Sequence, residues 1–184
     1  AGLLVSIAPR RSFSQAERAT VRDFVNRGGI LILMAGCEDA GPSRDLLSDF
    51  GFAIGSAGPE AEEPVPMGHF KAPYLRTEDR RVFVRFHAAW PVACSDPQAQ
   101  VIAYGKGNLP VIVMRRVGEG TVVVIGDTRF VTNDNLERED GQPFEGLREN
   151  ADFWRWFIRV LRDEPTWVPP ALRDMPKNET EDGL

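Results

Sequence analysis

The chain is poor in the residue types on which much of protein chemistry depends, since its 184 residues include only two cysteines and two histidines. Cys37 and Cys94 form neither a metal-binding pair nor a Cys-x-x-Cys redox motif. The spacing therefore predicts neither a zinc module nor a thiol–disulfide oxidoreductase. A disulfide between them and two separate thiols both stay open, and we expect two buried thiols because free cysteine packs well.

Long apolar runs and basic tracts are also missing. No apolar run approaches the ~20 residues that a membrane-spanning helix needs, and no basic, apolar leader stands at the amino end. The formal net charge is −5, which disfavours a nucleic-acid binder because such domains usually display a basic face. We expect no contact of this segment with a membrane or with nucleic acid. The sequence starts directly in a strand-like segment at Leu3, so we expect a fragment of a larger protein that lacks its native amino-terminal segment.

What the chain does contain suits one ordinary globular domain, with 42% hydrophobic and 27% charged residues. Only one core is evident along the sequence, and we place it within residues 1–165. The remaining residues, 166–184, are rich in proline and acidic side chains. We expect them to form a flexible tail.

The first half of the chain predicts a strand–helix–strand unit. Residues 3–8 and 30–34 are strand-like, and Ser14 and Glu17 stand at the spacing of a helix capping box. Gly28 and Gly29 then end the helix. Short links of this kind require the two strands to be parallel. A further short helix is expected to end at Gly51.

The second half predicts antiparallel pairing and a closing helix. Residues 82–86 and 92–94 are strand-like, whereas 55–80 are rich in proline and glycine and are expected to lack regular structure. The next strands are separated by short glycine-containing links, which predict two hairpins; they cover residues 101–104, 110–114 and 121–125. An apolar helix is expected from Leu147 to Arg162. The pattern thus predicts an α/β fold with a parallel core and an antiparallel hairpin extension.

The best candidate site lies where two buried strands end. Asp127, Thr128 and Arg129 follow the strand 121–125, and Cys37 and Glu38 follow the strand 30–34. Ligands of helix-covered parallel sheets gather beyond such carboxyl ends. The polar stretch continues downstream with three further candidates, namely Asn133, Asp134 and Asn135.

Two interpretations of these polar residues stay open. They form either a hydrogen-bonding rim for a small polar ligand or partner protein, or a set of turn residues that satisfy loop amides themselves. Glu38, Asp127 and Asp134 offer oxygen ligands, but their spacing matches no known cation-binding loop. We therefore predict no metal and no cofactor.

The chain resembles the DUF4350 branch of the class I glutamine-amidotransferase-like superfamily, which is related to GldG-type and intraflagellar-transport GIFT domains. The segments that carry the resemblance are Leu3–Pro9, Phe13–Glu17, Phe24–Leu33, Gly118–Asp127, Phe130–Asn133 and Glu149–Phe153. The resemblance implies a three-layer, flavodoxin-like sheet. It also implies a domain of a larger, membrane-anchored bacterial protein, on the extracytoplasmic side.

In that superfamily a nucleophilic cysteine stands in a Gly-Cys-x-Gly elbow and a His-x-Glu pair activates it. In this chain Gly36 and Cys37 match the first two residues of the elbow, and Asp39 replaces its second glycine. Where the His-x-Glu pair is expected, after the late strand, the chain has Asp127–Thr128–Arg129 and no histidine. The resemblance therefore implies a non-catalytic module that binds a ligand or a protein.

Two alternatives are kept. The first is a cysteine-dependent hydrolase or amidotransferase in which His69 or His87 serves Cys37 as base. The second is a ThuA-like domain that binds or processes carbohydrate, which rests on analogy of fold.

Overall fold

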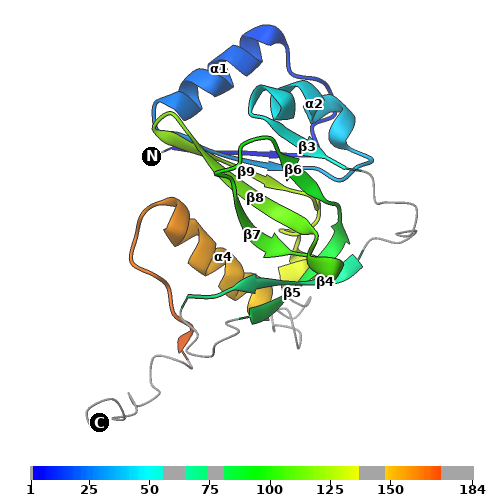
Figure 1. Cartoon of the computed structure of the whole chain (residues 1–184), viewed down its shortest axis with the longest axis vertical. Coiled ribbons are helices and arrows are strands. Elements are labelled where there is room, and N and C mark those ends of the chain that lie inside the picture. The colour runs from blue at the N-terminus through cyan, green and yellow to red at the C-terminus, as the bar shows by residue number, and fades with distance from the viewer. Residues whose placement is uncertain (1, 56–64, 74–80, 137–147, 171–184) are drawn as a thin grey trace.

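A mixed β-sheet with helices on both faces organises the protein (Figure 1). The structure is a computed structural model that describes residues 2–55, 65–73, 81–136 and 148–170. The main sheet contains β1 (Leu3–Ile7), β2 (Ile30–Met34), β4 (Val65–Lys71), β5 (Arg81–Ala89), β7 (Gln100–Tyr104), β8 (Pro110–Val117) and β9 (Gly120–Ile125). A small second sheet pairs β3 (Phe52–Ile54) with β6 (Val92–Cys94). The helices are α1 (Gln15–Asn26), α2 (Ala40–Asp49), α3 (Asn133–Leu136), α4 (Arg148–Leu161) and a 3₁₀ turn, η1 (Lys106–Asn108).

Strand directions divide the main sheet into two parts. Its strand order is β1-β2-β9-β8-β7-β4-β5. The pairs β1–β2 and β2–β9 are parallel, whereas every pair from β9 to β5 is antiparallel. The predicted strand–helix–strand unit and both predicted hairpins are present within this order.

The predicted flavodoxin-like fold with a parallel core is wrong. Only three of the seven strands pair in parallel, and the other four, β8, β7, β4 and β5, extend the sheet with antiparallel pairs. The buried runs that suggested a parallel core do not report strand direction, because a strand covered on both faces is apolar whichever way its neighbours run.

The segment expected to lack regular structure contains the strand β4. Its described side chains include the buried His69 and Phe70, and it pairs with both β5 and β7. Proline and glycine weaken its strand pattern, so this strand depends on its pairing with the next strand, β5, and with the more distant β7. The remainder of that segment, residues 56–64 and 74–80, lies outside the described residues.

The amino-terminal helix forms as the sequence predicts. The Ser14 hydroxyl accepts a hydrogen bond from the Glu17 amide at 3.3 Å, and the Glu17 carboxylate accepts one from the Ser14 amide at 2.8 Å. A bidentate contact with Arg11 holds the pKa of Glu17 at about 2. Gly28 ends the helix with a φ of 92°, which favours glycine.

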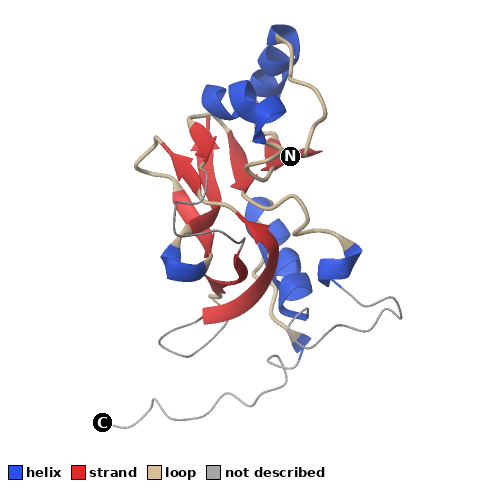
Figure 2. Ribbon diagram, turned by 90° about the vertical axis from the view of Figure 1, so that its right-hand side faces the viewer, coloured by secondary structure: helices blue, strands red, loops and turns tan. Residues whose placement is uncertain are grey.

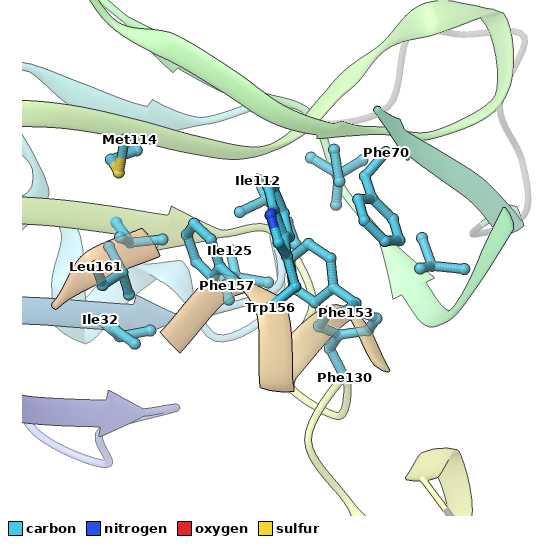
Figure 3. Packing of buried hydrophobic residues seen from close by; sticks show 14 of the residues in the cluster. Ile32, Phe70, Ile112, Met114, Ile125, Phe130, Phe153, Trp156, Phe157 and Leu161 are labelled. Atoms are coloured by element: carbon cyan, nitrogen blue, oxygen red, sulfur yellow. The ribbon is translucent and has the colours of Figure 1, made fainter. Parts of the chain in front are cut away.

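Two hydrophobic clusters cover the two faces of the sheet. On one face, Val21 and Val25 of α1 and Leu46 and Leu47 of α2 pack on the sheet, together with Phe52 of β3. On the other face lies α4, as both views show (Figures 1 and 2). Figure 3 shows the α4 residues Phe153, Trp156, Phe157 and Leu161 against the sheet residues Ile32, Ile112 and Ile125.

The burial of the two ends of the described chain differs from what the sequence suggests. β1 forms an edge of the sheet, and Leu3, Val5 and Ile7 are each 45–51% exposed, so this apolar strand is not a core strand. Trp167 lies beyond the predicted domain boundary at residue 165, yet it is buried in the cluster on α4. The predicted tail from 171 onward lies outside the described residues. Among the helices that are described, none is long and apolar enough to cross a membrane.

Candidate functional site

A cleft opens where β2 and β9 end side by side. The register pairs Met34 with Ile125, and the Ala35 amide donates to the Ile125 carbonyl at 3.1 Å, so the two following loops leave the sheet together. The cleft has a volume of about 520 Å³, and its lining residues are Gly36, Glu38, Asp39, His87, Ala88, Trp90, Asp127, Thr128 and Arg129. Four of the predicted site residues therefore meet here: Glu38, Asp127, Thr128 and Arg129.

The third wall of the cleft comes from the end of β5, of which the sequence analysis named only His87, as an alternative base for Cys37. The Trp90 amide donates to the Gly126 carbonyl at 2.7 Å, which joins the segment after β5 to the end of β9. A side chain at position 126 would collide with the Trp90 carbonyl, so glycine permits this approach. His87, Ala88 and Trp90 enter the cleft by this route. Strands 81–89 and 120–125 are not neighbours in the sheet, so no periodicity in the sequence signals the contact.

Asp127 is fully buried and holds the edge strand β5 in place. One carboxylate oxygen accepts from the His87 and Ala88 amides at 2.6 and 3.2 Å, and the other accepts from the Arg129 amide at 2.9 Å. Burial raises the pKa of Asp127, although the three amide donors oppose this rise. Both oxygens of Asp127 already accept backbone hydrogen bonds. Of the two interpretations left open by the sequence, this residue therefore fits the one in which polar side chains bond loop amides, not the one in which they bind a ligand.

Thr128 connects the loops that follow β9 and β2. Its hydroxyl accepts from the Gly36 amide at 3.0 Å and donates to the Asp39 carboxylate at 3.0 Å. Asp39 stands at the start of α2 but makes no side-chain cap for that helix. The threonine hydroxyl therefore fixes the position of the Asp39 carboxylate in the cleft.

Arg129 and His87 form the exposed mouth of the cleft. The guanidinium Nη1 of Arg129 lies 3.2 Å from Nε2 of the His87 ring. A guanidinium only donates hydrogen bonds, so Nε2 accepts, and this contact requires a neutral imidazole. Within the described part of the chain, no carboxylate oxygen lies within ion-pair distance of Arg129.

Cys37 stands apart from the groups that could activate it. It is a half-buried free thiol and does not line the cleft, and Cys94 is likewise free. Among the described residues, no hydrogen bond joins the Cys37 sulfur to either imidazole. The His87 ring contacts Arg129, while His69 stacks on Tyr104 with 5.4 Å between ring centroids. The described residues also hold no cluster of metal-ligating side chains.

The three predicted site residues after Arg129 do not join the cleft as a group. Asn133 and Asp134 belong to α3, and their side chains lie outside the described residues. Asn135 is buried and donates to the Arg85 and Phe130 carbonyls at 2.9 and 3.2 Å. It is thus a packing residue that links α3 to β5, not part of a binding rim.

The chain belongs to the family described as a domain of unknown function, DUF4350, whose model matches residues 1–156. No curated protein sequence matches the chain.

Solved structures with a similar fold are distant in sequence. The "mmIFT52 N-terminal domain" is 16% identical with a TM-score of 0.66, over 91% of this chain and 80% of that domain. A cytoplasmic protein of Salmonella typhimurium LT2 is 14% identical with a TM-score of 0.51, over 86% of this chain and 71% of that protein. Gan42B, a GH42 β-galactosidase from G. stearothermophilus, is 18% identical with a TM-score of 0.50, over 90% of this chain but only 22% of the enzyme. These identities establish likeness of fold alone, and the first of these folds replaces the flavodoxin-like assignment.

Proposed function

We propose that this domain is a non-catalytic module that binds a small polar ligand or a segment of a partner protein in the cleft between β2, β9 and the end of β5. The observation that carries the proposal is the set of charged groups in that cleft. Glu38, Asp39 and Arg129 line about 520 Å³ of space, and none of them has an ion-pair partner among the described residues. Ligand pockets commonly have volumes of this order.

The rigidity of the cleft floor supports the same conclusion. Asp127 accepts hydrogen bonds from backbone amides, and Thr128 bonds both the Gly36 amide and the Asp39 carboxylate. These bonds hold the floor of the cleft in place before any ligand binds. A preorganised site loses less conformational freedom on binding and therefore binds more tightly. The unpaired charges stand on this floor, where a polar ligand would meet them.

The hydrolase alternative receives less support from the geometry. A thiol nucleophile needs a base within hydrogen-bonding reach, and Cys37 bonds to neither imidazole in the described part of the chain. Its side chain also lies outside the lining of the cleft. The carbohydrate-binding alternative rests on fold likeness, which does not carry function.

Wider relationships are proposed on the resemblance of sequence segments alone. We propose kinship of the family with glutamine-amidotransferase-like and GldG-type domains, for which the Gly36–Cys37 pair after a buried strand is the support. We likewise propose that the domain belongs to a larger, membrane-associated bacterial protein and lies on its extracytoplasmic side.

The proposal is tested by binding and by activity. Pools of sugars, nucleotides, carboxylates, amines, amino acids and short peptides are added to ¹⁵N-labelled protein. We expect at least one pool to shift the Gly36 and Thr128 amides and the Trp90 indole N–H, which a Trp90→Phe variant assigns. Amides at the Gly118 turn, at the opposite end of the sheet, serve as the internal control.

Two results contradict the proposal. The first is that no pool of molecules shifts the Gly36, Thr128 or Trp90 signals. The other is turnover of amide or ester substrates that disappears in Cys37→Ala protein, because such turnover would make Cys37 a nucleophile.

A further inference from the structure

The cleft holds opposite charges that do not neutralise each other. Elsewhere in the described part of the chain, eight arginines pair with a carboxylate at 2.6–3.4 Å, namely Arg11, Arg18, Arg22, Arg27, Arg115, Arg116, Arg155 and Arg162. Arg129 instead contacts the neutral acceptor of His87, and no described carboxylate pairs with its positive charge. The carboxylates of Glu38 and Asp39 line the same cleft, but neither lies within ion-pair distance of Arg129.

The positive end of the cleft suits a carboxylate. A guanidinium carries five N–H donors in a planar fork, and the His87 contact occupies a donor on Nη1. The remaining donors can hold a carboxylate through two parallel hydrogen bonds. Arg129 is exposed at the mouth, so such a ligand group meets it without prior rearrangement of the fold.

The negative end of the cleft suits an ammonium group. Asp127 does not contribute, because its buried oxygens already accept three backbone hydrogen bonds. Asp39 is held by the Thr128 hydroxyl through one oxygen, and its other oxygen has no hydrogen-bond partner among the described residues. Glu38 adds a second, exposed carboxylate.

Thr128 sets the separation of the two ends. It is hydrogen-bonded to Asp39 and is the chain neighbour of Arg129, so one small molecule can span both charges. A plain anion would be repelled by Glu38 and Asp39, and a plain cation by Arg129. Only a ligand with both charges matches both ends.

We propose that the cleft binds a small dipolar molecule of the amino-acid type, with its carboxylate on Arg129 and its ammonium group on Glu38 and Asp39. This assignment rests on the proposed function and narrows it to one ligand class. Trp90, whose indole lies against Gly36, also lines the cleft.

The test uses ω-amino acids of increasing length as probes: glycine, 4-aminobutyrate and 6-aminohexanoate. Butyrate and butylamine serve as controls because each keeps a four-carbon chain and one of the two charges. We expect at least one ω-amino acid to shift the Gly36, Thr128 and Trp90 signals with an affinity about tenfold or more above both controls. The length that binds best then measures the separation of the charges.

Three variants locate the two ends. Arg129→Gln and Glu38→Gln are each expected to weaken binding of the best probe by about tenfold. Arg27→Gln removes another exposed arginine, near the amino end of β2 and therefore remote from the cleft, and should leave binding unchanged. Spectra of the free variants check that each one folds.

The failure of this inference is distinguishable from that of the proposed function. If butyrate or butylamine binds as well as the ω-amino acids, the dipolar assignment is wrong. It is also wrong if no ω-amino acid binds while another class of molecule shifts the same signals, although the cleft is then still a binding site. If no molecule of any class shifts them, both conclusions fail.

Discussion

The side-chain amide of Asn150 pairs with both backbone groups of Arg85. Its oxygen accepts from the Arg85 amide at 2.8 Å, and its nitrogen donates to the Arg85 carbonyl at 2.8 Å. Arg85 belongs to β5, which is an edge strand of the main sheet. Exposed strand edges can pair with other chains. Here Asn150 bonds the backbone of Arg85, and Asp127 accepts from the amide of His87, two residues further along β5, so side chains of the same domain bond these edge groups.

Replacement of Asn150 by aspartate tests this closure of the edge. Asn150 is fully buried and also donates to the Asn135 carbonyl at 2.9 Å. An aspartate keeps the acceptor and loses both donor contacts, which leaves carbonyl oxygens facing a carboxylate. We expect Asn150→Asp to lower the free energy of unfolding by ~3 kcal/mol in urea titrations. Gln98→Glu makes the same chemical change at an exposed position and should alter it by less than about 0.5 kcal/mol. A similar effect of the two substitutions would contradict the role of Asn150.

Asp127 gives a pH-dependent prediction. Burial raises its pKa in the folded protein above the value of about 3.9 in the unfolded chain. Between those two values the folded protein binds more protons than the unfolded chain, so stability from this group is present at low pH and falls as pH rises. We expect the stability of the native protein relative to Asp127→Asn to decrease from pH 4 to pH 7 in urea unfolding. An increase with pH would mean that the three amide donors outweigh burial and lower the pKa.

Thr128 tests the link between the two loops of the cleft. In Thr128→Val the Gly36 amide loses its acceptor and the Asp39 carboxylate loses a donor, with little change of shape. We expect a loss of about 1–3 kcal/mol in the free energy of unfolding. Thr128→Ser retains the hydroxyl and is expected to lose less than half as much. If valine and serine have equal effects, the hydroxyl bonds contribute nothing to stability.

Phe153 tests the cluster between α4 and the sheet. Its ring is fully buried and lies 5.0, 5.5 and 5.3 Å from the rings of Phe70, Phe130 and Phe157. Phe153→Ala removes these contacts and leaves a cavity, so we expect a loss of about 3–5 kcal/mol, measured by thermal and urea unfolding. Phe83 is 61% exposed, and Phe83→Ala should cost less than about 1 kcal/mol. Equal losses would mean that α4 does not depend on this ring.

The local elements were largely predictable because short-range rules govern them. Ser14 and Glu17 form their capping box, and a helix from Leu147 to Arg162 was expected where α4 runs from Arg148 to Leu161. The hairpins around Lys106 and Gly118 follow from short links between strand-like runs. Hydrogen bonds between residues a few positions apart decide such features, so the sequence window contains all their partners.

The candidate site was only partly predictable. The rule that polar residues gather at carboxyl ends of parallel strands brought Glu38 together with Thr128 and Arg129, as the parallel pairing of β2 and β9 requires. It did not find His87 or Trp90, because β5 reaches the cleft through a backbone contact at Gly126 and not through its place in the sheet.

The sequence by itself determined which segments become helices and buried strands, since spacing of apolar residues and capping groups act over a few positions. Only the tertiary structure decided that β1 lies at an exposed edge, that β4 forms within a proline-rich segment, and that the sheet is mixed. It also decided that the Asp127 carboxylate accepts backbone hydrogen bonds from the end of β5, while Arg129 contacts His87 and has no carboxylate partner among the described residues. The reason is that strand order and the partners of a buried polar group depend on segments brought together from distant parts of the chain.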